Sequence, residues 1–205
     1  MGQTCTLLLH IDAEGVAELA ATGSRVVVAK PAGSAPPNVA WLAIEPRTRI
    51  SIAWEELYGV FASNTAVRSD STIAVASRVH PATERRIYTY DGLRFADART
   101  EARIPPGHYD VWNAGPAAAT FGLLQAASVD GTVLQSPLNA VVLPADFTAD
   151  FTPDTRVYVW TQRGAETGAI IGEVPRHAAV LAFGGQHRSR SYRYDGSGAV
   201  FVPGP

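Results

Sequence analysis

Turn signals divide this sequence into many short segments, and this feature limits the possible folds more than any other. Asp-Gly pairs occur at 91–92, 130–131 and 195–196, and stretches rich in proline and glycine separate most other segments. Between them lie about a dozen short runs rich in β-branched and aromatic residues, with turn signals every roughly eight to twelve residues. This pattern is typical of an all-β protein, so we predict an antiparallel β-sandwich or barrel.

Only one segment favours a helix. Asp12 is a suitable N-cap, residues 13–21 are rich in Ala and Glu, and Gly23 can end the helix. We therefore predict one short N-terminal helix between two strands. The stretch Lys30–Asn38 contains several prolines and glycine, which predicts a surface loop. We also predict strands at Val39–Ile44 and Ile170–Val174.

One predicted strand is irregular. Ile50, Ile52 and Trp54 alternate with polar or small residues, which indicates one buried face and one face in water. Glu55 and Glu56 interrupt this alternation, and two acidic residues are poor formers of a tight turn. We therefore expect a bend or β-bulge at these two positions, after which the strand resumes.

A five-residue pattern occurs twice, about half the chain length apart. Tyr-Thr-Tyr-Asp-Gly occupies 88–92 and Tyr-Arg-Tyr-Asp-Gly occupies 192–196, and each follows a basic cluster. We therefore predict an internal two-fold repeat. Residues 1–115 form the first β repeat and residues 116–205 the second, within one compact pseudo-symmetric unit.

Composition narrows the class of partner. The formal net charge is −2, which provides no field of one sign for holding nucleic acid or an anionic membrane. Cys5 is the only cysteine, so a disulfide framework and a thiolate metal cluster within one chain are excluded. The sequence shows no secretory or membrane-spanning pattern, and we expect a cytoplasmic protein. Residues 1–6 fit the loose pattern for N-myristoylation at Gly2, but we favour the start of a strand.

The repeated hairpins are the leading candidates for a binding site. Two tyrosines on one strand face offer a flat apolar surface with polar tips, which suits stacking on a sugar or aromatic ligand. The aspartate can accept hydrogen bonds from hydroxyls, and the arginines can hold a carboxylate or phosphate. The predicted ligand-binding residues are Arg86, Tyr88, Tyr90, Asp91, Arg190, Tyr192, Tyr194 and Asp195. The alternative is structural, because tyrosine is a good strand residue and Asp-Gly forms turns.

A second set of residues indicates acid–base chemistry. His108 and Asp110 share one face of a predicted strand, so an imidazole and a carboxylate can approach there. Glu55 lies near aromatic strand residues, an arrangement common at sugar-binding and glycosidase sites. If the protein is an enzyme, we predict His108, Asp110 and Glu55 as its catalytic residues.

We predict no metal and no cofactor. The five histidines lack His-x-His or His-x-x-x-His spacing, although ligands from distant strands can still form a site in cupin-type barrels. No phosphate-binding, dinucleotide-binding or Gly-x-Ser-x-Gly motif is present.

These observations favour a non-enzymatic, lectin-like binding module. It would present its two hairpins to a polar or anionic small molecule or a carbohydrate. One alternative is a small cofactor-independent enzyme with a His/carboxylate site in a barrel or inter-sheet cavity. Another is a self-assembling structural protein, in which the aromatic hairpins join the subunits of a homo-oligomer.

Overall fold

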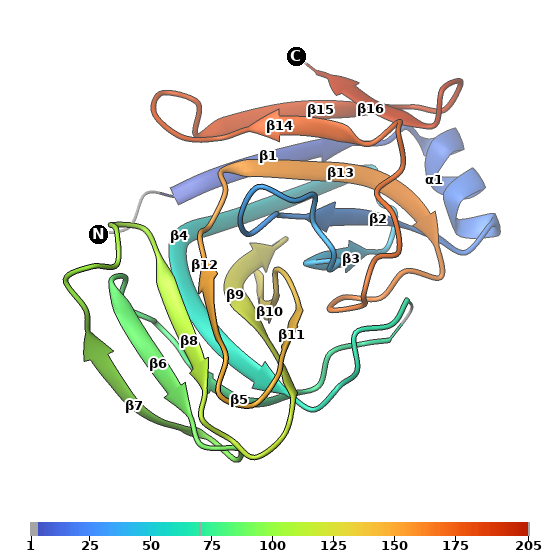
Figure 1. The fold of residues 1–205 in the computed structure, drawn as a ribbon. Coiled ribbons are helices and arrows are strands. Elements are labelled where there is room, and N and C mark those ends of the chain that lie inside the picture. Colours follow the sequence, from blue (N-terminus) through green and yellow to red (C-terminus); the bar gives the residue numbers. More distant parts are fainter. Residues whose placement is uncertain (1–3, 70, 205) are drawn as a thin grey trace.

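The protein is mostly β, with three sheets and one short helix in the part of the chain that the structure describes (Figure 1). This computed structural model describes residues 4–69 and 71–204, so the candidate myristoylation site, Gly2, lies outside the described residues. The helix is α1 (Ala13–Ala21). The strands are β1 (Thr4–His10), β2 (Ser24–Ala29), β3 (Leu42–Ile44), β4 (Arg49–Ser63), β5 (Val75–Val79), β6 (Arg86–Tyr90), β7 (Phe95–Thr100), β8 (Tyr109–Asn113), β9 (Ala119–Val129), β10 (Thr132–Pro137), β11 (Val141–Leu143), β12 (Thr148–Phe151), β13 (Arg156–Arg163), β14 (Ala179–Ala182), β15 (Ser189–Asp195) and β16 (Val200–Pro203).

Three sheets organise these strands. The eight-stranded sheet has the order β10-β9-β4-β1-β15-β16, with β11 also paired to β9 and β5 to β4. The second, here called the β8 sheet, has the order β12-β8-β6-β7, and the third, the β13 sheet, has the order β14-β13-β2-β3. Figure 1 shows β4 as a long curved strand that runs from the side of β1 towards β5. The predicted all-β class with one short N-terminal helix is therefore confirmed.

One apolar core connects the three sheets. Leu7 of the eight-stranded sheet, Val111 of the β8 sheet and Val28 of the β13 sheet are fully buried in the same hydrophobic cluster. Each sheet has an apolar face that must leave water, and packing the three faces together achieves this.

The ends of α1 follow the sequence signals. The Asp12 carboxylate accepts a hydrogen bond of 2.7 Å from the backbone N–H of Gly15, and Gly23 has a φ of 63° just after the helix. Gly15 also lets the helix approach β15, because an added Cβ would lie 3.1 Å from the ring of Tyr194. The predicted helix is confirmed.

Two of the three Asp-Gly pairs form different kinds of turn. Asp130 and Gly131 both have positive φ, 49° and 89°, and form the two-residue connection between β9 and β10. Asp91 instead begins a longer loop, and its carboxylate accepts hydrogen bonds from the backbone N–H groups of Leu93 and Arg94.

Some predicted boundaries are wrong. Ile170–Val174 is not a strand and makes only an isolated bridge at Ile170, while the strand predicted at Val39–Ile44 is limited to Leu42–Ile44. Lys30 does not begin a surface loop, because it is fully buried. No helix in the described residues is long and apolar enough to cross a membrane.

Candidate functional site

The tyrosines of the repeated hairpins lie mainly in the interior. Tyr88 and Tyr90 on β6 are 2% and 1% exposed, and Tyr194 on β15 is 7% exposed. The Tyr88 hydroxyl donates to the carbonyl of Thr83 at 2.8 Å and accepts from its N–H at 2.6 Å. The Tyr90 hydroxyl donates to the carbonyl of Gly92. These rings are packing and turn-forming groups, and their faces are not open to a sugar.

The remaining hairpin residues do not converge on one place. Asp91 and Asp195 accept hydrogen bonds from backbone groups of their own loops, and the N–H groups of Arg94 and Leu93 lower the pKa of Asp91. Tyr192 and Arg86 are half-buried on different sheets, and Arg190 donates to the carbonyl of Ala182. The structure therefore does not assemble these predicted residues into an open concave site.

His108 is paired with Asp150 on β12 instead of with Asp110. Its Nδ1 lies 2.7 Å from Asp150 Oδ2 and 3.1 Å from the hydroxyl of Thr152. Asp110 and Asp150 are register partners across β8 and β12, and burial followed by the charge of Asp150 raises the pKa of Asp110. The reason for the changed partner is geometric. His108 precedes β8 and lies diagonally across from Asp150, a separation that long side chains can bridge, whereas residues two apart on one strand diverge.

The predicted irregularity at Glu55 and Glu56 is confirmed as a bulge. Trp54 pairs with Ala127 of β9, and the next pair joins Tyr58 to Gln125. Three residues of β4 therefore lie opposite a single residue of β9. Two extra residues preserve the alternation of the strand, so Glu55 is exposed while Glu56 lies between Trp54 and Tyr58 on the inner face. The bulge therefore places Glu56, and not Glu55, on the interior side.

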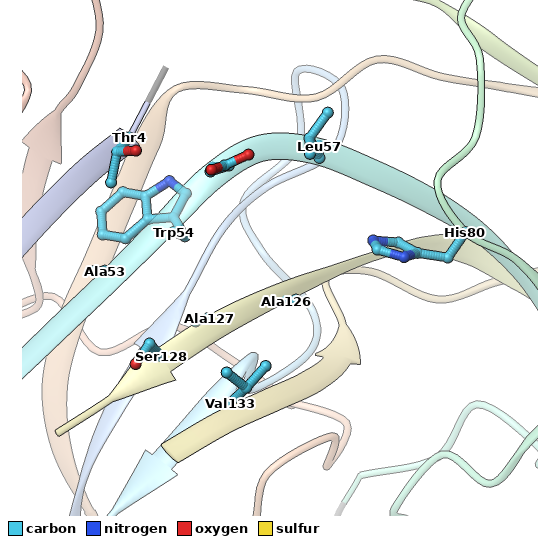
Figure 2. Close-up of a pocket in the computed structure, with 10 residues that line it drawn as sticks. Thr4, Ala53, Trp54, Leu57, His80, Ala126, Ala127, Ser128 and Val133 are labelled. Atoms are coloured by element: carbon cyan, nitrogen blue, oxygen red, sulfur yellow. The ribbon is translucent and has the colours of Figure 1, made fainter. Parts of the chain in front are cut away.

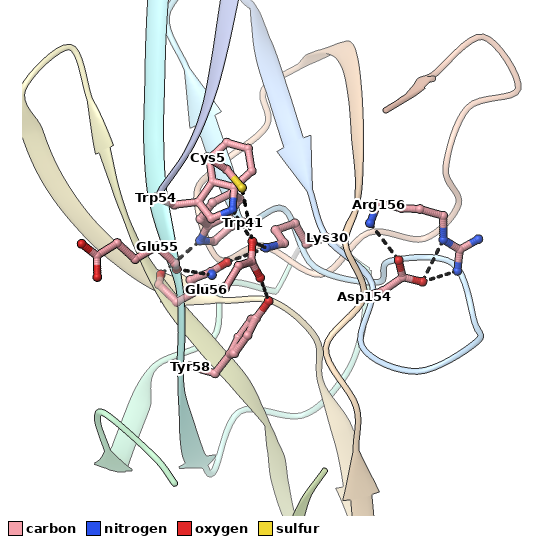
Figure 3. A network of polar contacts seen from close by, with 10 residues as sticks. Cys5, Lys30, Trp41, Trp54, Glu55, Glu56, Tyr58, Asp154 and Arg156 are labelled. Atoms are coloured by element: carbon pink, nitrogen blue, oxygen red, sulfur yellow. Dashed lines mark hydrogen bonds and ion pairs between the residues drawn. The ribbon is translucent and has the colours of Figure 1, made fainter. Parts of the chain in front are cut away.

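Glu56 accepts hydrogen bonds from several protein donors (Figure 3). Its Oε1 accepts from Trp54 Nε1 at 2.7 Å and from Lys30 Nζ at 3.3 Å, and its Oε2 accepts from the Tyr58 hydroxyl. The thiol of Cys5 makes a long contact of 3.9 Å with Oε1, and burial raises the pKa of that thiol. This set of donors matches the acceptors of an ionised carboxylate, which has no proton to give.

Lys30 follows β2 and is fully buried behind Glu56 (Figure 3). Its Nζ donates to Gln125 Oε1 at 2.8 Å and to Glu56 at 3.3 Å. The same atom lies 5.3 Å from the ring centroid of Trp54 and 5.5 Å from that of Trp41. Burial lowers the pKa of Lys30, and the charge of Glu56 opposes this shift. A buried ammonium requires such partners because burial removes its hydration.

Glu56 also borders a pocket, which we call the Glu56 pocket. Its volume is about 600 Å³, and it lies where β4 of the eight-stranded sheet approaches β8 and the chain after β12. Tyr58 and Tyr109 line it with their ring centroids 6.2 Å apart, and Glu84 and Thr152 also border it. Burial, with the charge of Glu84 as the next cause, raises the pKa of Tyr109 to about 12. The pocket thus combines aromatic rings, hydroxyls and carboxylates.

A second pocket lies on the opposite side of the bulge (Figure 2). Its volume is about 310 Å³, and Glu55, Leu57, His80 and Val133 are among the residues that line it. Burial and the charge of Arg78 lower the pKa of His80. The structure therefore separates Glu55 from the Glu56 pocket, near which His108 lies through its hydrogen bond to Thr152.

No group of three or more His, Cys, Asp or Glu side chains among the described residues is arranged to hold a metal ion.

The central residues of the Glu56 pocket had a recognisable sequence signal. Trp54, Glu56 and Tyr58 continue the alternation of Ile50 and Ile52, so strand periodicity alone places Glu56 on the buried face. The position of Lys30 had only a weak signal, since it ends a run of small and β-branched residues that reads equally well as a strand followed by a loop.

Comparisons of the chain with protein-family models, with curated proteins and with solved structures gave no match. A function for this chain must therefore be inferred from the chemistry of its own pocket.

Proposed function

We propose that this protein binds a small polar ligand of the carbohydrate class in the Glu56 pocket. The observation that carries this proposal is a carboxylate fixed by protein donors beside two tyrosine rings in a cavity of about 600 Å³. Cavities of this size suit small ligands, and aromatic rings suit the apolar face of a sugar. The proposed site is the pocket and not the repeated hairpins, whose tyrosines are mostly buried.

The Glu56 carboxylate has capacity left for a ligand. A carboxylate offers about four lone-pair sites, and Oε2 accepts from only one protein donor, the Tyr58 hydroxyl, among the described residues. The Glu56 side chain is 26% exposed, so a ligand hydroxyl can reach it. Glu84 and the hydroxyls of Thr83 and Thr152 supply further polar groups along the wall.

A second candidate is an acid–base enzyme that uses the same pocket. Its support is the pairing of His108 with Asp150, because an imidazole oriented by a carboxylate is suited to accept a proton. Thr152 joins this pair to the pocket, since it hydrogen-bonds to His108 and lines the cavity. Turnover of a bound sugar that is lost in His108→Gln would favour this candidate over simple binding.

A glycan array followed by calorimetric titration tests the binding proposal. Glu84→Gln changes an exposed wall residue and should weaken binding of an identified sugar by about tenfold. Arg190→Gln changes a hairpin residue outside the pocket and should leave binding unchanged. The proposal fails if no sugar binds, or if Arg190→Gln abolishes binding while Glu84→Gln does not. Circular dichroism checks that both variants are folded.

We also propose that the two hairpins descend from an internal duplication within a β-sandwich. β6 pairs with β7 antiparallel and with β8 parallel, while β15 pairs with β16 antiparallel and with β1 parallel. The second tyrosine of each motif faces a phenylalanine on the partner strand, with ring centroids 5.6 Å apart for Tyr90 and Phe95 and 5.4 Å for Tyr194 and Phe201. Superposing the two three-strand units tests this proposal, and unmatched tyrosines would refute it.

A further inference from the structure

We propose that the ligand of the Glu56 pocket carries a positive charge, as an organic ammonium such as an amino sugar does. This inference rests on the proposed function, because it assigns a chemical class to the ligand of the same pocket. It excludes the anionic ligands that the arginines of the hairpins suggested from the sequence.

The wall of the pocket has charges of one sign. Glu56 and Glu84 line it, and no lysine, arginine or histidine is among the described residues that do so. The other lining residues that a ligand meets are uncharged, with the phenols of Tyr58 and Tyr109 the largest of them. An anionic group in this pocket would therefore face carboxylates without a cationic partner.

Lys30 balances the charge of Glu56 without being available to a ligand. Its side chain is 1% exposed, and its ammonium donates to Gln125 Oε1 as well as to Glu56. A ligand in the pocket thus meets the carboxylate of Glu56, while the compensating ammonium stays buried behind it. The pair contributes little net charge but presents its negative end to the cavity.

The charge of Glu84 has no comparable compensation. Its Oε2 accepts a hydrogen bond from the backbone N–H of Gly107, and no ion pair to Glu84 is formed by the described residues. The nearby Arg156 is already held by Asp154, whose Oδ2 lies 2.8 Å from its Nε. A monocation in the pocket would therefore neutralise the negative charge of Glu84.

The tyrosine rings favour the same sign of charge. Tyr58 and Tyr109 meet edge to face, and burial is the first cause that raises the pKa of each, with Tyr109 reaching about 12. Both phenols are thus neutral at physiological pH. A neutral aromatic face attracts a cation through its quadrupole, most strongly where water is partly excluded. Rings and carboxylates together form a site for an ammonium group attached to an apolar or sugar body.

Calorimetric titration with matched probes tests the sign of the charge. D-glucosamine, D-glucose and D-glucuronate present similar rings with positive, neutral and negative charge, at a mildly acidic pH where the amine is protonated. Benzylamine and benzyl alcohol repeat the comparison without a sugar. We expect glucosamine to bind about tenfold more tightly than glucose, and glucuronate to bind most weakly. Raising the salt concentration should reduce this difference.

Two charge-matched variants locate the effect. Glu84→Gln should weaken glucosamine binding about tenfold more than it weakens glucose binding, and so remove most of the preference for glucosamine. Glu173→Gln removes the same charge from an exposed position outside the pocket and should keep the preference.

The possible outcomes separate this inference from the proposed function. Equal binding of glucose and glucosamine, or tighter binding of glucuronate, would overturn the positive charge while leaving a sugar site in place. Glu84-dependent binding of benzylamine without any sugar binding would support the charge and reject the carbohydrate class. Failure of every probe would reject both.

Discussion

Replacing Glu56 by glutamine should leave the buried Lys30 ammonium without a counter-charge. Nζ and Oε1 are 3.3 Å apart, so the attraction is about 5 kcal/mol at an effective dielectric constant of about 20. The glutamine carbonyl can still accept from Lys30 and Trp54, and the Glu56 side chain is partly exposed to screening water. We therefore expect Glu56→Gln to lower the free energy of unfolding by about 3 kcal/mol, near the lower end for broken buried ion pairs.

The loss of stability in Glu56→Gln should depend on pH in a defined direction. Burial lowers the pKa of Lys30 in the folded protein, whereas an unfolded lysine keeps a value of about 10.4. Between these two values the unfolded chain binds more protons, so stability rises with pH. Removing the charge of Glu56 lowers the folded pKa of Lys30 further. The deficit of Glu56→Gln relative to the unmodified protein should therefore shrink as the pH rises from neutral towards about 10.

Urea denaturation followed by tryptophan fluorescence measures both effects, since Trp41 and Trp54 lie beside Lys30. Glu55→Gln is the matched control, because Glu55 is the exposed neighbour on the same bulge. Lys30→Met should lower the free energy of unfolding less than Glu56→Gln does. The carboxylate that Lys30→Met leaves unpaired can reach water, whereas the ammonium that Glu56→Gln leaves unpaired cannot. The reasoning is refuted if Glu56→Gln lies within about 1 kcal/mol of Glu55→Gln, or if its deficit is independent of pH.

Three further predictions concern the scaffold. Gly122→Ala should prevent stable folding, because an added Cβ would collide with the backbone oxygen of Asn139, whereas Gly131→Ala has open space and should cost only about 1 kcal/mol for its φ of 89°; thermal denaturation distinguishes them. Asp91→Ala should lower the melting temperature through its hairpin loop without changing ligand binding by calorimetry. Tyr109→Phe should remove the phenol whose pKa burial raises to about 12, so an ultraviolet absorbance titration of the variant should lack one ionisation at high pH. An unchanged titration curve would contradict the buried position of this residue.

Local signals in the sequence were sufficient for three features of the local structure. The N-cap at Asp12, the two-residue turn at Asp130 and Gly131 and the bulge at Glu55 and Glu56 depend on residues that are near neighbours along the chain. Capping, positive φ and the interrupted alternation of a strand each have a physical cause that acts over a few residues. These features could therefore be predicted without knowledge of the packing.

The composition of the pocket depends on partners that are distant in sequence. The acceptor that holds Lys30, Gln125, is 95 residues away, and the carboxylate that orients His108 is 42 residues away. The burial of Tyr88 and Tyr90 likewise follows from how the sheets pack and not from the alternation of β6. A strand pattern shows which residues share a face but not which of the two faces is covered, so the alternation of β6 could not show that its tyrosines are buried.

The Lys30–Glu56 pair is an unfavourable way to stabilise this core. Buried ion pairs lose hydration that their attraction only partly returns, and apolar residues of similar volume often give equal or greater stability. The rings of Trp41, Trp54 and Tyr58 already surround the ammonium. A methionine in place of Lys30 would pack against their apolar surface. Stability alone therefore does not account for the pair. Its distinctive consequence is a carboxylate held by several donors at the edge of a cavity, with its counter-charge buried away from that cavity, and our proposed ligand site uses this arrangement.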